Sequence, residues 1–144
     1  MKKFMLLAAL SAALYVQVNA QVIEVTSVPQ PVVTSFQSGY PGVGPVVWTK
    51  NGTLYVADYK VNSADRYVTY DATGKLVEVG EGVDENSLPE NAKVYVKTKY
   101  KGDHIKKVYK IKDANGVTIW KGKVKEDYVM FDENGNPMKM KRDD

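Results

Sequence analysis

The sequence predicts an α+β domain in which two tandem helix-plus-four-strand units form one antiparallel sheet, with both helices packed on one face. Three observations predict this fold. Landmark residues recur about sixty positions apart, each set opens on a helical apolar pattern, and short alternating segments separated by Asn-Gly or Asp-x-x-Gly signals follow. One domain over residues 21–144 is expected, with unit one at about 27–80 and unit two at about 87–141.

The repeat is visible at both ends of each unit. The segment SVPQ at 27–30 recurs as SLPE at 87–90, an offset of 60. The segment YVTYDATG at 67–74 recurs as YVMFDENG at 128–135, an offset of 61. Two landmark sets in the same order indicate a duplicated structural unit.

Each unit is predicted to begin with a helix. Ser27 and Ser87 suit the N-cap position, and Gln30 and Glu90 three residues later complete a capping box. In unit two, residues 94–100 alternate as a strand would, but the repeated serine-proline start favours a helix there.

Four short strands are predicted after each helix. The pairs Asn51-Gly52 and Asn115-Gly116 suggest type I′ hairpin turns, and Asp71-x-x-Gly74 and its counterpart at 132–135 suggest further turns. A weakly marked extra strand is possible at 22–25. The eight expected strands are 46–50, 53–60, 66–70, 75–79, 105–112, 117–125, 128–131 and 137–140.

The first twenty residues have the three-part pattern of a signal peptide. Lys2 and Lys3 precede an apolar run at 4–16, and cleavage is expected between Ala20 and Gln21. An uncleaved membrane anchor is the alternative, but the run is shorter than the roughly 20 residues that span a bilayer. A periplasmic or secreted protein is therefore expected, with no membrane span after cleavage. It contains no cysteine, so the core alone must stabilise it.

These landmarks resemble the PepSY-like family, whose members are similar to beta-lactamase inhibitor proteins. The matching segments are Val28-Pro29, Phe36, Tyr40-Pro41, Val47-Trp48, 55–59 and 70–74, with Leu88-Pro89, Tyr100 and 131–135 in the second copy. The second copy departs at Val108, which stands where unit one has Trp48. The resemblance implies exported bacterial proteins with no assigned catalytic residues. PepSY modules are associated with restraining peptidases, and the inhibitor analogy implies a concave sheet that grips a partner.

Residues for catalysis or metal binding are sparse in the sequence. His104 is the single histidine and lies in a polar turn, where a surface role is expected. No catalytic residues, cofactor or metal are therefore predicted. The segment at 132–136 superficially resembles a calcium loop, but its glycine is misplaced and its first-unit counterpart lacks the ligands, so a structural hairpin is the interpretation.

A non-enzymatic protein-binding module is the predicted function, with inhibition of a secreted or periplasmic enzyme such as a peptidase as a candidate role. The alternative is a structural or small-ligand envelope protein that binds a peptide or polysaccharide. The expected partner is another exported protein and not nucleic acid, and the chain is expected to be a monomer. The candidate partner-binding residues are Trp48, expected to be partly exposed, and the lysine row Lys121, Lys123 and Lys125.

Overall fold

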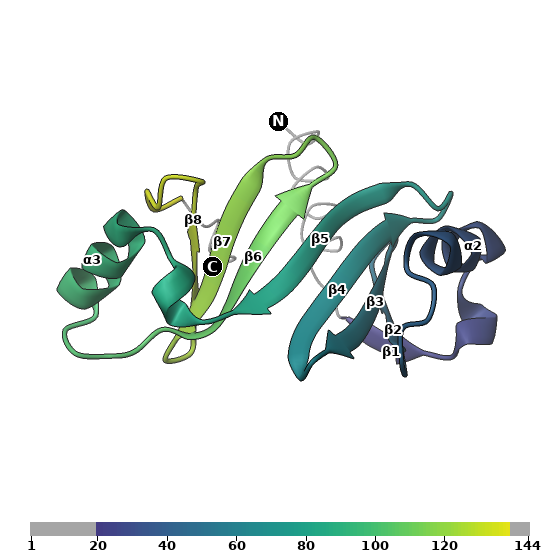
Figure 1. Cartoon of the computed structure of the whole chain (residues 1–144), viewed down its shortest axis with the longest axis horizontal. Coiled ribbons are helices and arrows are strands. Elements are labelled where there is room, and N and C mark those ends of the chain that lie inside the picture. Colours follow the sequence, from purple (N-terminus) through teal and green to yellow (C-terminus); the bar gives the residue numbers. More distant parts are fainter. Residues whose placement is uncertain (1–19, 139–144) are drawn as a thin grey trace, which may run out of the picture.

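A computed structural model describes residues 20–138 and contains one eight-stranded antiparallel sheet with two α-helices (Figure 1). The strands lie side by side in chain order, from β1 to β8, and the sheet is open. The predicted α+β class is confirmed. The elements are β1 (Gln21–Ile23), η1 (Val25–Ser27), α2 (Gln30–Gly39), β2 (Val47–Asn51), β3 (Leu54–Val61), β4 (Ala64–Asp71), β5 (Leu76–Val83), η2 (Glu85–Ser87), α3 (Glu90–Lys99), β6 (Lys106–Asp113), β7 (Thr118–Val124) and β8 (Asp127–Phe131).

Both helices pack on the same face of the sheet, which we call the helix face. Directly paired residues of an antiparallel sheet share a face. One such row crosses six strands through Trp48, Ala57, Val68, Val79, Lys112 and Thr118. Trp120 lies two residues beyond Thr118 and therefore also faces this side.

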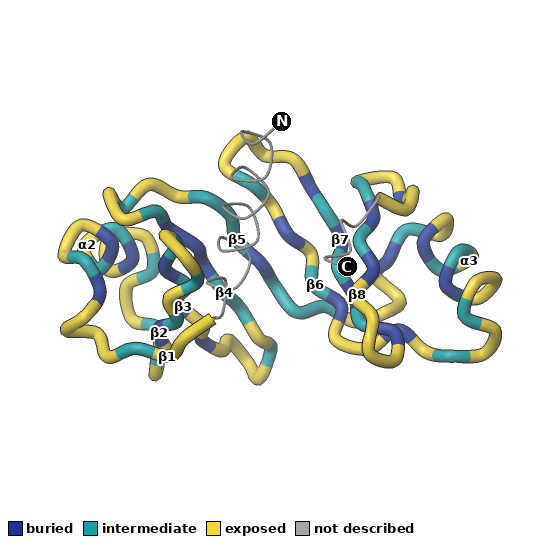
Figure 2. The backbone as a smooth tube through the Cα atoms, turned by 180° about the vertical axis from the view of Figure 1, so that it is seen from behind, coloured by how far each residue is buried: buried dark blue, intermediate teal, exposed yellow. Residues whose placement is uncertain are grey.

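The core consists of two separate clusters on the helix face, one beneath each helix. Helix α2 buries Val32 and Phe36 against β2, β3 and β4. Helix α3 buries Ala92 and Val96 against β6, β7 and β8. Figure 2 shows buried residues in both halves, in the helices and in the strands next to them.

The same order of elements occurs twice, but its boundary differs from the predicted one. A strand and a 3₁₀ turn precede each helix, and three strands follow it. The segment predicted to end unit one is β5, which leads into η2 and α3 as β1 leads into η1 and α2. The strand predicted at 137–140 is represented by one bridge between Pro137 and Phe131. Lys139 and Met140 lie outside the described residues, as does the predicted signal peptide apart from Ala20.

The predicted serine caps are wrong. Ser27 and Ser87 end the 3₁₀ turns, and the N-cap positions of α2 and α3 are Pro29 and Pro89, without a side-chain cap hydrogen bond. The carbonyl of Pro29 accepts the backbone N–H of Val32 at 3.0 Å. A proline here loses nothing, because the first-turn N–H has no partner within the helix. The predicted helix at 94–100 is confirmed over 94–99 as part of α3, and Tyr100 is the C-cap.

Both predicted type I′ turns are also wrong. Asn51 pairs with Leu54, so Gly52 and Thr53 form the turn, and only Gly52 has positive φ (62°). Glycine at the first central position is typical of a type II′ turn. At the second site, Asp113 accepts the backbone N–H groups of Asn115 and Val117, both at 2.9 Å, as Asp71 and Asp132 do in their turns. The Asp-x-x-Gly turn therefore occurs three times.

The Asp132 turn should make stability sensitive to acid. The carboxylate accepts the backbone N–H groups of Asn136 and Asn134, and these bonds hold its pKa below the usual value of 3.8. The contribution of Asp132 to the free energy of unfolding is therefore complete above pH 3.8. It is lost as the pH falls through the lower pKa of the folded state. Asp132→Asn should give a shallower loss of stability below pH 3.8 in urea titrations across an acid series.

Glu133→Gln is the matched control, because Glu133 is an exposed carboxylate of the same turn with no hydrogen bond within residues 20–138. An acid profile that changes equally in both variants would contradict this assignment to Asp132.

Candidate functional site

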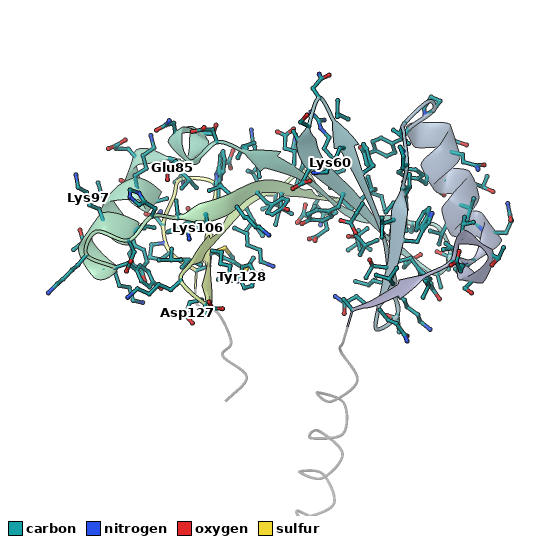
Figure 3. The ribbon with its side chains drawn as sticks, turned by 90° about the horizontal axis from the view of Figure 1, so that it is seen from below. Lys60, Glu85, Lys97, Lys106, Asp127 and Tyr128 are labelled. Atoms are coloured by element: carbon teal, nitrogen blue, oxygen red, sulfur yellow. The ribbon has the colours of Figure 1, made fainter. Side chains whose placement is uncertain are left out.

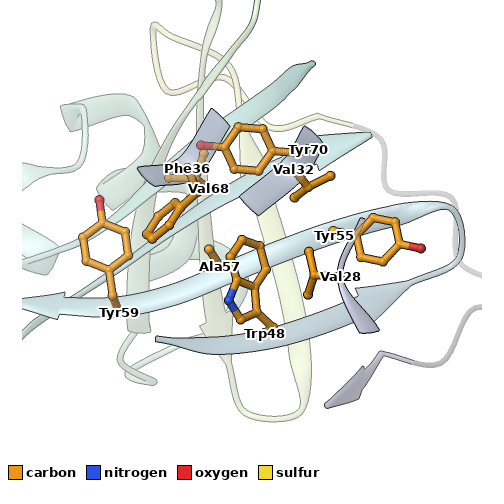
Figure 4. Close-up of a cluster of buried hydrophobic side chains, with 9 residues drawn as sticks. All are labelled: Val28, Val32, Phe36, Trp48, Tyr55, Ala57, Tyr59, Val68 and Tyr70. Carbon is orange, nitrogen blue, oxygen red and sulfur yellow. The ribbon is translucent and has the colours of Figure 1, made fainter. Parts of the chain in front are cut away.

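Trp48 is buried, so the expectation that it is partly exposed is wrong. Its side chain is 6% exposed and meets the ring of Phe36 edge-on at a centroid distance of 5.4 Å (Figure 4). The alternation of β2 places Trp48 on the helix face, directly opposite Ala57. A binding surface needs accessible atoms. Trp48 therefore belongs to the first core cluster and not to the candidate site.

Two of the three predicted lysines lie together on the opposite face. Lys121 and Lys123 alternate with the core residues of β7 and lie 4.7 and 5.8 Å from the ring centroid of Tyr128. Tyr128 is directly opposite Lys123 in β8 and is 47% exposed. A lysine ammonium near an aromatic ring is attracted to its face, so these three side chains form one amphipathic group.

Lys125 does not extend this row. Strand β7 ends at Val124, and Lys125 has a positive φ of 54° in the turn to β8. Its ammonium pairs with Asp103 at 3.1 Å, in the loop after α3. The chain reversal therefore removes Lys125 from the alternation that the sequence suggested.

The face that bears Lys121 and Lys123 carries no helix in the described chain, and we call it the open face. Figure 3 shows the sheet bent into an arch with a helix at the outer side of each end and Tyr128 on the inner side. The centre of the open face lies where β4, β5 and β6 adjoin. There the rings of Tyr67 and Tyr109 are 5.9 Å apart.

Two glycines of β5 allow these rings to meet. Gly80 lies directly opposite Tyr67, and Gly82 lies directly opposite Tyr109. A Cβ at Gly80 would overlap the Tyr67 ring. The two rings therefore meet over β5, because Gly80 and Gly82 carry no side chains that would separate them. Sequence reasoning missed this pair, although two glycines at alternate positions of a strand signal a close approach on one face.

The polar surroundings of the ring pair differ from those of the lysines. The Tyr67 hydroxyl lies 3.2 Å from a carboxylate oxygen of Glu78, and burial, reinforced by that carboxylate, raises the pKa of Tyr67 above its ordinary value. Beside the rings lies a cavity of about 380 Å³ whose lining includes Asp58 and Asp65. Burial raises the pKa of Asp58, with Asp65 adding to the effect. Asp65 is paired with Lys60 at 2.8 Å, so Asp58 and Glu78 give the first half of the open face its acidic side, and Lys121 and Lys123 give the second half its basic side.

His104, the remaining residue considered for chemistry, lies on the surface. His104 is exposed in the loop between α3 and β6, as predicted. Residues 20–138 contain no cluster of three or more His, Cys, Asp or Glu side chains suited to a metal ion. Within the same residues, neither helix is long and apolar enough to cross a membrane.

Comparison with solved structures places this architecture among proteins of Bacteroides. A DUF2874 family protein from Bacteroides uniformis has a TM-score of 0.68 and 19% sequence identity, covering 77% of this chain and 86% of that chain. The chain has the fold of the DUF2874 family. A BLIP-like protein from Bacteroides fragilis has the same fold, with a TM-score of 0.60 and 21% identity over 77% of this chain and 84% of its own.

A third neighbour is a Bacteroides eggerthii protein provisionally assigned to the periplasm, with a TM-score of 0.69, 16% identity and coverage of 77% of this chain and 86% of that chain. The predicted resemblance to inhibitor-like proteins is confirmed at the level of the fold. Neither a family model nor a curated protein sequence matches the chain. Because these identities are low, the shared fold does not define the function of the chain. A function has to be inferred from the residues of the chain itself.

Proposed function

We propose that the chain is an exported, non-enzymatic binding module that grips another exported protein with the open face of its sheet. The observation that carries the proposal is a face without a covering helix that presents Tyr67, Tyr109 and Tyr128 beside Lys121 and Lys123. Tyrosine is enriched at protein interfaces, because it supplies a large apolar area together with a polar group.

The arrangement of this face suits a protein partner better than a small molecule. Its aromatic residues come from strands β4, β6 and β8, so they are spread across half of the sheet. A protein surface can contact such a spread of side chains at once, and the arch gives both ends of the sheet access to a convex partner (Figure 3). We also propose that the two halves are copies of one unit, with the acidic side of the face contributed by one and the basic side by the other.

The proposed export of the chain and the proposed inhibition of an enzyme are supported by different observations. Export is supported by the predicted signal peptide and by the periplasmic assignment of a structural neighbour. Inhibition of an exported enzyme, such as a peptidase, is suggested by the shared fold of a BLIP-like protein. The direct test of inhibition is whether the purified chain slows the partner enzyme once that partner has been isolated.

The open face should be tested by a combined Lys121→Glu, Lys123→Glu and Tyr128→Ala variant. We expect a loss of at least about 2 kcal/mol of binding free energy, or about thirtyfold in Kd, if these residues form a central contact. The measurement is Kd for the partner recovered by cross-linking from the native cell envelope. Thermal unfolding of the variant checks that the fold is retained.

Lys125→Glu is the matched control, since Lys125 follows the same strand but pairs with Asp103 outside the face. An unchanged Kd in the combined variant, or an equal loss in the control, would remove the lysine side of the open face from the interface.

A further inference from the structure

A second cavity lies on the helix face, in the gap between the two core clusters. It has a volume of about 300 Å³. Its lining residues come from the end of α2 and from strands β3 to β7: Tyr40, Tyr59, Arg66, Val79, Gly80, Glu81, Lys110, Lys112 and Thr118. Neither helix covers this gap, because each packs over its own end of the sheet. It shares Tyr59 and Arg66 with the cavity beside the Tyr67 and Tyr109 rings, but those rings and the lysines of the open face do not line it.

The register of the sheet places five side chains in a single row beside this cavity. Directly paired residues run from β3 to β7 as Tyr59, Arg66, Glu81, Lys110 and Trp120. The row therefore has an aromatic ring at each end, two cations inside them and one carboxylate at its centre. Lys112 projects from the same face of β6, two residues beyond Lys110. Three cations against one carboxylate leave a formal excess of two positive charges.

The three cations have few hydrogen-bond or ion-pair partners within the described residues. Arg66 approaches Glu81 only to 3.7 Å, which is an ion pair but not a hydrogen bond, and its buried Nε has no acceptor in the described chain. Within residues 20–138, neither Lys110 nor Lys112 forms a salt bridge, and the ammonium of Lys110 instead lies 5.4 Å from the Trp120 ring centroid.

Trp120 does not line the cavity but belongs to the second core cluster, next to Lys110 in the row. It is 8% exposed, and its indole N–H has no acceptor among the described residues. Buried donors are normally hydrogen-bonded, so the unpaired Nε of Arg66, a lining residue with excess positive charge around it, favours an acceptor-rich ligand.

We propose that this cavity binds a small oxyanion, the carboxylate or sulfate group of an acidic sugar. Arg66 and Lys112 supply charge-assisted hydrogen bonds, and the hydroxyls of Tyr40, Tyr59 and Thr118 supply neutral ones. The rings of Tyr40 and Tyr59, which both line the cavity and lie 5.9 Å apart, suit the apolar faces of a sugar ring. This site does not rest on the proposed protein-binding function, because Lys110, Lys112 and Thr118 line it and do not line the open-face cavity.

The test is a two-dimensional NMR titration with three separate probes: glucuronate, sodium sulfate and neutral glucose. The two tryptophans provide an internal comparison, since Trp120 ends the charged row and Trp48 belongs to the first core cluster. Glucuronate or sulfate should shift the Trp120 indole signal and the amides of Lys110 and Lys112 with a common Kd. Glucose should not. The glucuronate and sulfate arms show which oxyanion is preferred.

Lys112→Gln should raise the Kd of the bound anion about tenfold, the effect of losing one charge-assisted hydrogen bond. Lys75→Gln removes the same charge from an exposed turn outside the cavity and should leave Kd unchanged. Arg66→Gln provides a second variant whose fold can be checked independently by thermal unfolding. Absence of saturable shifts at Lys110 and Lys112, equal shifts with glucose, or an equal loss of affinity in the Lys75 control would overturn the proposal.

Discussion

Phe36→Ala should lower the free energy of unfolding by about 3–5 kcal/mol, the range for truncating a buried aromatic side chain. Phe36 is 4% exposed and lies at the centre of the first cluster. Its ring centroid is 5.4 Å from both Tyr40 and Trp48, and 5.8 Å from Tyr59. These contacts join α2 to β2 and β3, so truncation should loosen the helix and leave a cavity.

The measurement is urea unfolding, with the midpoint expected to fall while the denaturant slope remains unchanged. Val94→Ala is the matched control, because Val94 is a helical residue of α3 that is 54% exposed. Its effect should be within about 0.5 kcal/mol of zero. A Phe36→Ala effect no larger than that of the control would contradict the assignment of Phe36 to the core.

Gly80→Ala should distort the open face and destabilise the chain by about 1–3 kcal/mol, as expected for overpacking. The added Cβ would overlap the ring of Tyr67, which must then move away from β5. This movement should break the contact between the Tyr67 hydroxyl and Glu78 and separate the Tyr67 and Tyr109 rings. Partner affinity should fall as well, because the centre of the proposed interface would be displaced.

A double-mutant cycle distinguishes ring displacement from a general effect of alanine in a strand. Removing the ring with Tyr67→Ala should abolish most of the cost of Gly80→Ala, because the overlapping atoms are then absent. Gly44→Ala is the neutral control, since its Cβ would meet no atom within 4 Å. Additive effects of the Gly80 and Tyr67 changes would show that the close approach does not constrain the face.

The fold class could be predicted because its signals are local and repeated. Alternation placed Tyr55, Ala57 and Tyr59 on one face of β3, and the structure buries all three. The strand-like pattern at 94–100 indicates a helix only in the context of the second landmark set, and α3 extends to Lys99. The serine caps failed for a physical reason: a 3₁₀ turn and a proline N-cap satisfy the same start pattern without using the serine side chain.

The candidate site was less predictable, because its geometry depends on pairing between strands distant in sequence. Alternation correctly grouped Lys121 with Lys123, but it could not show that the turn carries Lys125 away. The tyrosine pair of the open face needs the register of β5 with both neighbours, which no single segment specifies. The sequence does not show that Trp48 is buried, because aromatic residues are common both in small cores and on binding surfaces.

Site-specific photocross-linking from the two sides of the molecule tests most directly whether the open face binds the partner. A photoreactive residue at Lys121 would sample the open face, and one at exposed Val94 would sample the outer surface of α3. Both variants would be expressed with the native signal segment and irradiated in intact cells. We expect one discrete protein adduct from Lys121 and none from Val94. An adduct from Val94 alone would contradict the claim that the open face grips the partner.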